Sequence, residues 1–114
     1  ISFGIRNVSD VPRALAEMRR VLRPGGVALV LEFSLPANAF LRRLYLGYFR
    51  HVLPHLGRLL SGDAGAYRYL NASVEEFPYG ETFCRLLREA GFSSAACTPL
   101  TFGVATLYEA TGER

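Results

Sequence analysis

The stretch RVLRPGGVALVLEFS at residues 20–34 constrains the fold of this chain more than any other feature of its sequence. Arginines followed by the triplet Pro-Gly-Gly at 24–26 are typical of a helix end and a glycine turn. The run at 27–31 is apolar at every position, so it predicts a central parallel strand covered on both faces. A helix, a turn and a buried strand in this order indicate an α/β fold.

A helix is expected immediately before this turn. Ser9 and Asp10 are good N-caps, and Pro12 is tolerated in a first helical turn. Apolar residues then recur at spacings of three and four and form one helix face: Val11, Leu15, Met18 and Leu22. Residues 1–5 are apolar and broken by a glycine, which is consistent with the last residues of a buried strand.

The second half of the chain predicts three helices. The first runs from residue 40 to about 52, where Pro54 interrupts it. Residues 73–76 have the form of a capping box and should begin a short helix. The third runs from residue 79 or 80 to 90, with Gly91 as its left-handed stop.

Two strands are expected to close the chain, at residues 94–100 and 104–110. The link between them, Thr101-Phe102-Gly103, has only three residues. A link that short requires the two strands to be antiparallel.

Length and charge limit the class of protein. With 114 residues, half of them hydrophobic, the chain has the size of one domain with a sizeable core. The net charge is +3, but the arginines are spread without interleaved aromatic residues, so no nucleic-acid partner is expected. The sequence shows no apolar run of the roughly 20 residues that span a bilayer. It begins without methionine or a signal-peptide pattern, so we expect a piece of a longer protein.

The cysteines and histidines predict neither a disulfide nor a metal site. Cys84 and Cys97 fit no disulfide or CxxC framework, which favours a reducing, cytoplasmic location. His51 and His55 are four residues apart, but Pro54 lies between them and no third ligand is near in the sequence.

The stretch at 20–34 closely resembles a signature of the ubiquinone/menaquinone biosynthesis C-methyltransferases, which are class I S-adenosylmethionine-dependent enzymes. The matching residues are Arg20, Val21, Pro24, Gly25, Gly26, Glu32 and Ser34, while Arg23 takes a position that is more often lysine. Further segments that resemble the family are 2–8, 51–54, 67–70 and 100–104. The similarity covers nearly the whole chain in the right order.

The resemblance implies a fold. It is the C-terminal half of a class I methyltransferase (Rossmann-like) sheet, with parallel strands ending in an antiparallel hairpin and helices on both faces. Residues 1–114 would form a partial domain, from the end of strand four to strand seven, that lacks the N-terminal cofactor-binding half. The glycines at 25, 26, 57 and 62 do not form a G-x-G-x-x-G loop after a strand. We therefore expect the chain to be inactive alone.

The resemblance also implies a reaction and its residues. The family methylates a ring carbon of a prenylated quinol, a precursor of menaquinol or ubiquinol, with S-adenosylmethionine as cofactor. Arg6 and Asn7 would be the catalytic residues, and Ser2 would approach the cofactor. The alternatives are that Arg6 pairs with a carboxylate such as Asp10, that Asn7 caps the next helix, and that the Ser2 hydroxyl bonds to backbone.

Three tyrosines and one carboxylate are further candidates. Tyr45, Tyr67 and Tyr69 would line the substrate pocket, although aromatic residues also serve as core. Glu32 ends a buried strand and needs a partner there, so pairing is favoured over catalysis. The apolar stretch at 40–49, with arginines among its residues, is either a core helix, a cover over the prenyl tail, or a face that contacts a membrane surface.

Two other readings stay open, one from the same fold and one from another class. One is a methyltransferase that acts on another lipid or small molecule. The other is a non-catalytic interaction module that keeps half of the fold. Residues 1–5 would then be an exposed strand edge, which favours pairing into a dimer or a swapped dimer. The sequence does not distinguish benzoquinone from naphthoquinone substrates.

Overall fold

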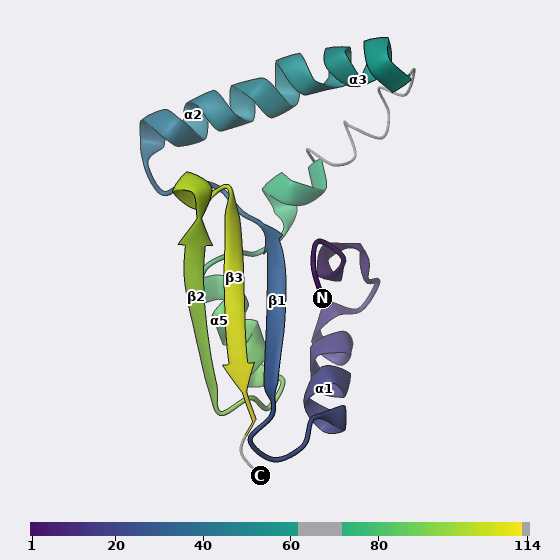
Figure 1. The fold of residues 1–114 in the computed structure, drawn as a ribbon, viewed down its shortest axis with the longest axis vertical. Helices are drawn as coiled ribbons and strands as arrows, with labels where there is room; N and C mark the ends of the chain where they lie inside the picture. Colours follow the sequence, from purple (N-terminus) through teal and green to yellow (C-terminus); the bar gives the residue numbers. More distant parts are fainter. Residues whose placement is uncertain (62–71, 113–114) are drawn as a thin grey trace.

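The computed structural model describes residues 1–61 and 72–112. Figure 1 shows a small sheet with helices beside it and a long helical arm across one end. The elements in chain order are η1 (Ile5–Asn7), α1 (Val11–Val21), β1 (Val27–Phe33), α2 (Ala39–Gly47), η2 (Tyr48–Val52), α3 (Leu53–Ser61), α5 (Glu81–Glu89), β2 (Ser94–Leu100), η3 (Thr101–Gly103) and β3 (Ala105–Thr111). A short helical segment also covers residues 72–76.

The sheet has the strand order β1-β3-β2, and β3 runs antiparallel to both of its neighbours. The predicted antiparallel hairpin is confirmed, and η3 makes its short link. The expected parallel strands are seen only in part: within the described residues β1 and β2 run in the same direction but do not pair, because β3 lies between them. Within the described residues, the parallel contact of β1 is with the N-terminal segment, where Ser2 bridges to Leu31.

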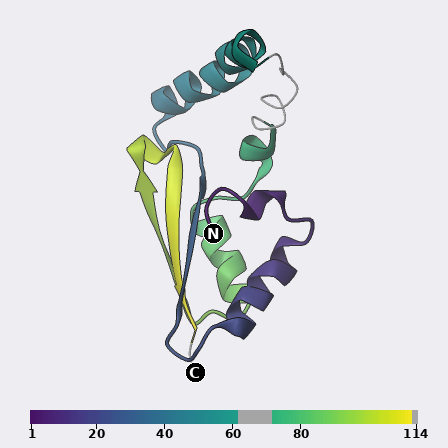
Figure 2. The same ribbon diagram turned by 45° about the vertical axis from the view of Figure 1, so that its right-hand side comes forward.

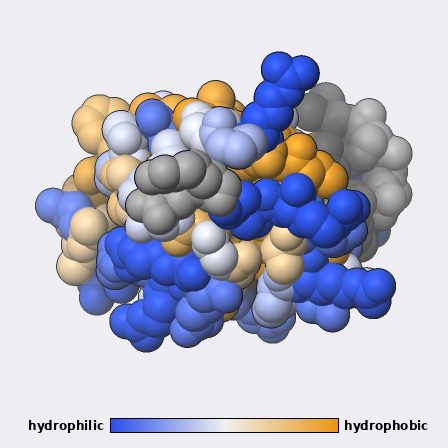
Figure 3. All heavy atoms as spheres, turned by 90° about the horizontal axis from the view of Figure 1, so that it is seen from below, coloured by the Kyte–Doolittle hydropathy of each residue, from blue (hydrophilic) through white to orange (hydrophobic). Residues whose placement is uncertain are grey.

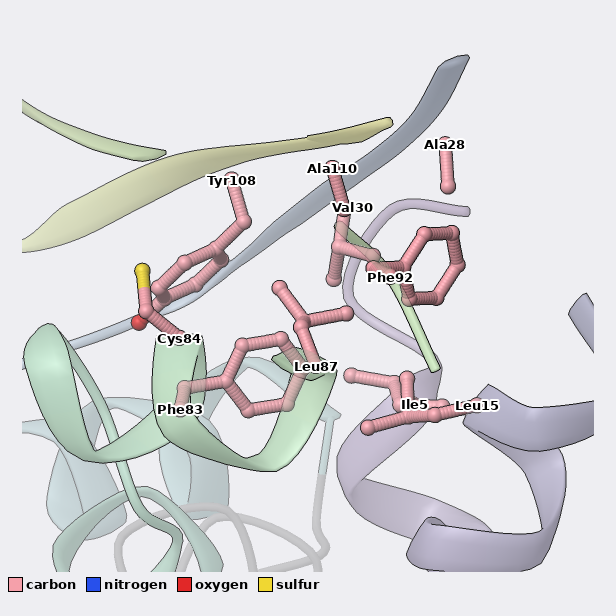
Figure 4. Packing of buried hydrophobic residues seen from close by; sticks show 10 residues of the cluster. All are labelled: Ile5, Leu15, Ala28, Val30, Phe83, Cys84, Leu87, Phe92, Tyr108 and Ala110. Carbon is pink, nitrogen blue, oxygen red and sulfur yellow. The ribbon is translucent and has the colours of Figure 1, made fainter. Parts of the chain in front are cut away.

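Helices cover one face of the sheet. Figure 2 shows α1 and α5 on the same side of the strands. The buried residues of this layer are Ile5, Leu15, Ala28, Val30, Phe83, Cys84, Leu87, Phe92, Tyr108 and Ala110. Figure 4 shows Phe83 and Leu87 of α5 pointing towards Tyr108 and Val30 of the sheet. The rings of Phe83 and Tyr108 lie 4.5 Å apart between centroids.

The prediction of helices on both faces is wrong for the described residues. Val27 and Leu29 point away from the helices and are 49% and 52% exposed. The apolar pattern of β1 shows that both faces of the strand are hydrophobic. It does not show that the described residues provide a helix to pack on each face. Figure 3 views the molecule from below, where hydrophilic side chains dominate and apolar patches lie among them.

Local sequence signals set the ends of both helices that cover the sheet. The Asp10 carboxylate accepts a hydrogen bond from the backbone N–H of Arg13 at 3.1 Å and so caps α1. Gly80 (φ 63°) precedes α5, and Gly91 (φ 110°) ends it as predicted. These glycines adopt backbone angles that other residues populate only at a cost.

Pro54 does not end the second helix. The arm continues through α2, η2 and α3, and η2 is a π-turn in which the N–H of Leu53 donates to the carbonyl of Tyr48. A π-turn inserts an extra residue into a helical turn, so the proline sits in the first turn of α3 without interrupting the helix. The glycine-rich sequence at 61–65 predicts a loop after this arm, and except for residue 61 it lies outside the described residues.

Candidate active site around Arg6 and Glu32

Glu32 lies near the C-terminal end of β1, and its side chain is 1% exposed. The Nε atom of Arg6, whose side chain is 7% exposed, lies 3.2 Å from Oε1 of Glu32. The Nε–H does not point along a hydrogen bond, so the contact is an ion pair. The carboxylate also accepts hydrogen bonds from the backbone N–H groups of Phe33 at 2.9 Å and Arg6 at 3.4 Å. These donors hold the Glu32 carboxylate in one orientation.

Aromatic contacts fix the other side of the guanidinium. The Cζ atom of Arg6 lies 5.3 Å from the centre of the Phe33 ring, which is in the range of a cation–π contact. The Phe33 ring in turn packs on Phe3, with 4.6 Å between centroids. Arg6 is therefore held between a carboxylate and a ring before any ligand arrives.

The carboxylate partner of Arg6 is Glu32 and not Asp10, whose carboxylate caps α1. The sequence indicated that Glu32 needed a partner and that Arg6 would pair or catalyse. It did not indicate that the two meet, because 26 residues separate them. Asn7 is exposed at the end of η1 and does not provide the α1 side-chain cap, a role that belongs to Asp10.

Arg6 also forms part of the wall of a pocket of about 430 Å³. The other residues that line it are Val11, Ala72, Ser73, Glu76, Phe77, Pro78 and Leu86. Apolar walls with a few polar groups are typical of sites that bind a largely hydrophobic small molecule. The pocket joins η1 and the start of α1 to the short segment that leads into α5.

Tyr45 of α2 is brought close enough to Arg6 for the two groups to interact. Burial raises the pKa of the Tyr45 hydroxyl to about 12, and the nearby positive charge of Arg6 opposes that rise. The hydroxyl is therefore protonated at neutral pH and can donate a hydrogen bond. Tyr67 and Tyr69, the other predicted pocket residues, lie outside the described residues.

The described residues do not fit S-adenosylmethionine on their own. Ser2, the residue predicted to approach it, is exposed at the edge of the sheet, where its backbone bridges to Leu31. Within 1–61 and 72–112, no glycine-rich loop follows a strand to cradle a cofactor. Ser34, a residue of the signature, donates a hydrogen bond to the carbonyl of Gly103 at 2.7 Å and is buried, so it is structural.

A mixed α/β chain with these signature residues at the ends of its strands is a methyltransferase fragment. A sequence model of the ubiE/COQ5 methyltransferase family matches residues 1–112, so the chain belongs to this family. The family is that of S-adenosylmethionine-dependent C-methyltransferases of quinone biosynthesis.

Curated relatives come from distant organisms. The chain is 51% identical, over its whole length, to the ubiquinone/menaquinone biosynthesis C-methyltransferase UbiE of Geobacter sulfurreducens, of which it covers 43%. Over 96% of its length it is 44% identical to the demethylmenaquinone methyltransferase of Chlorobaculum parvum, of which it covers 45%. It is also 44% identical over 95% of its length to the mitochondrial 2-methoxy-6-polyprenyl-1,4-benzoquinol methylase of Dictyostelium discoideum, of which it covers 34%. The chain thus spans less than half the length of these relatives.

Proposed function

We propose that this chain forms the quinol-side part of a C-methyltransferase that transfers a methyl group from S-adenosylmethionine to a ring carbon of a prenylated quinol. Residues 1–114 would be the C-terminal part of that enzyme's domain. The observation that carries the proposal is the buried Arg6, oriented by Glu32, in the wall of a largely apolar pocket. Family membership and the names of the relatives support the same reaction.

The chemistry needs a positive charge at this place. A ring carbon ortho to a phenol becomes nucleophilic when the hydroxyl loses its proton, here to a water. The carbon then takes the methyl group, S-adenosylhomocysteine leaves, and the proton on that ring carbon passes to water as the aromatic ring is restored. A fixed guanidinium beside the ring oxygen stabilises the resulting phenolate, and it does so most strongly where water is excluded. Arginine does not act as the base, since it stays protonated at all ordinary pH values. The role of Arg6 in the proposal is therefore electrostatic.

Neighbouring residues take supporting roles in the proposal. Glu32 keeps the guanidinium in one orientation through the ion pair. Tyr45, which is protonated at neutral pH, donates a hydrogen bond to a ring oxygen, and Asn7 positions a water or the second oxygen. Ser2, Tyr67 and Tyr69 keep their predicted roles beside the cofactor and in the pocket. The bound cofactor supplies the methyl group, and the rest of its site is assigned to the N-terminal half of the enzyme.

The test is a chimera that joins this chain to the part of the Geobacter sulfurreducens relative that precedes the matched region. Methyl transfer from labelled S-adenosylmethionine is measured with a demethylmenaquinol analogue and a benzoquinol analogue, both with short prenyl tails. S-adenosylmethionine binding is measured by calorimetry on the chimera and on the chain alone. We expect the chimera to bind the cofactor and methylate at least one quinol, and the chain alone to do neither.

Arg6 is tested in the same chimera. Loss of one preorganised electrostatic group typically lowers kcat by about 10²- to 10³-fold, which is the effect expected for Arg6→Gln. The pH–rate profile should also move to higher pH, because the phenol ionises less readily without the cation. Arg13→Gln, on the exposed face of α1, is the matched control. Tight cofactor binding by the chain alone, or an Arg6→Gln rate within threefold of the parent, would overturn the proposal.

A further inference from the structure

The helical arm of residues 39–61 carries a stripe of exposed apolar side chains. Figure 1 shows the arm crossing one end of the sheet and extending beyond it. Six large apolar residues of the arm are each at least 40% exposed: Phe40, Leu44, Tyr48, Val52, Leu56 and Leu59. The ends of the stripe are the most exposed, with Phe40 at 68% and Leu59 at 82%. Exposed apolar side chains that follow one another along one element mark an interaction site.

The stripe stays on one side because of the π-turn. An α-helix has 3.6 residues per turn, so residues spaced by four drift steadily around its axis. Between Tyr48 and Val52 the turn is wider, since the bond from Leu53 N–H to the Tyr48 carbonyl spans five residues. Four residues make slightly more than one turn of an α-helix but less than one turn of the wider π-turn. The π-turn therefore rotates the following side chains back towards the face from which they had drifted. The wide turn thus extends one apolar face along the length of the arm.

The charge of the arm has a single sign. Residues 39–61 contain four arginines, at positions 42, 43, 50 and 58, and no aspartate or glutamate. The whole chain has a net charge of +3 and the arm +4, so the remaining residues together carry −1. The positive charge of the molecule is thus concentrated on the element that carries the apolar stripe.

Individual contacts leave several cationic groups at the surface of the arm. The Nε of Arg42 donates to the Pro36 carbonyl at 3.0 Å, and Arg50 pairs with Glu75. Arg43 and Arg58 are exposed. Arg42, Arg43, Arg50 and His51 line a basic hollow of about 450 Å³ along the arm. This hollow has the size and charge to receive phosphate groups.

We infer that the arm is a docking surface for an anionic lipid bilayer. An amphipathic helix with an apolar stripe and a basic remainder lies in the membrane interface, with the apolar side chains below the headgroups and the arginines at the phosphates. Within the described residues, no helix has the length and apolar character to cross a bilayer. The arm carries no carboxylate, so nothing on it repels a uniformly negative surface such as that of an anionic bilayer.

The test measures binding of the whole chain to vesicles by flotation. One set of vesicles contains phosphatidylcholine alone. The other contains phosphatidylcholine with about 30 mole per cent phosphatidylglycerol, an anionic lipid. We expect binding to the anionic vesicles, little binding to the neutral ones, and a loss of binding as salt is raised. Each arginine near such a surface contributes about fivefold in affinity, so Arg43→Gln with Arg58→Gln should weaken binding about 25-fold.

A second pair of variants tests the apolar stripe. Phe40→Ser with Leu59→Ser removes its two most exposed side chains and should abolish flotation without changing the circular dichroism of the chain. Val21→Ser on α1, where the side chain is 67% exposed, is the matched apolar control, and Arg13→Gln is the charge control. Equal binding to both vesicle types, or no binding to either, would refute the inference. Loss of a dimer, seen by light scattering, in the Phe40 and Leu59 variant would show that a second copy occupies the stripe instead.

Discussion

Replacing the buried ion pair one partner at a time tests whether Arg6 and Glu32 form a unit. Glu32→Gln leaves the Arg6 guanidinium buried against a neutral amide. Oε1 of Glu32 accepts the backbone N–H of Phe33 and Oε2 accepts that of Arg6, so the amide nitrogen of glutamine would place a donor against one of these donors. Arg6→Gln leaves the Glu32 carboxylate, which is 1% exposed, without its counter-charge.

The expected size follows from burial. Breaking a buried pair by removing one partner costs about 3 to 5 kcal/mol, since the remaining charge keeps its desolvation penalty. With one partner still 7% exposed, we expect about 3 kcal/mol for each single variant. The double variant removes both charges and should lose only about 3 to 4 kcal/mol in total. The coupling free energy between the two sites is then about 2 to 3 kcal/mol.

Urea unfolding followed by circular dichroism gives the four free energies of unfolding in this cycle. Arg6→Lys serves as a second probe, because it keeps the charge and loses the planar contact with Phe33. Glu17→Gln breaks the exposed pair between Glu17 and Arg20 on α1 and should leave stability unchanged. Additive losses in the double variant, or single losses no larger than that of the exposed pair, would refute the reasoning.

Two further predictions concern other elements. Burial raises the pKa of Tyr108 to about 12, and its hydroxyl accepts a hydrogen bond from the Gly80 N–H at 2.7 Å. An unfolded tyrosine titrates near 10, so the contribution of Tyr108 to the free energy of unfolding should be constant below about pH 10 and fall as the pH rises towards 12. Tyr108→Phe should flatten that fall in urea titrations at stepped pH, and an unchanged slope would contradict it. Phe102 is 81% exposed at φ 60°, a strained angle for phenylalanine, so Phe102→Gly should raise the free energy of unfolding by up to about 1 kcal/mol. A lower melting temperature would show that the ring contributes packing.

The sequence predicted the elements whose limits depend on neighbouring residues. Asp10 caps α1, Gly91 stops α5, and the three-residue link makes the final strands antiparallel, because each effect acts within a few residues. The strand at 94–100 has the predicted bounds. Arg6 and Tyr45 were predicted as site residues and Glu32 as a residue that needs a partner, and the structure brings Arg6 close to both of the others.

What could not be predicted depends on distant parts of the chain. The meeting of Arg6 with Glu32 joins residues 26 positions apart, and sequence pattern carries no distance between them. The insertion of β3 between β1 and β2 is a choice among sheet orders that periodicity does not distinguish. Pro54 was expected to end a helix, but the π-turn before it changes the local backbone so that the helix continues. The residue pattern did not predict that turn.

The attachment of the N-terminal segment has a consequence for the site. Arg6 follows a stretch that joins the sheet through backbone hydrogen bonds between Ile1 and Leu29, Ile1 and Leu31, and Phe3 and Leu31. Glu32 belongs to β1, which pairs along its full length with β3. Arg6 therefore follows a segment held by few hydrogen bonds, whereas Glu32 lies in a fully paired strand. The N-terminal segment should separate from the sheet before β1 does. A segment that paired with this edge would add backbone hydrogen bonds to it and would keep the Arg6 guanidinium in the pocket wall for longer.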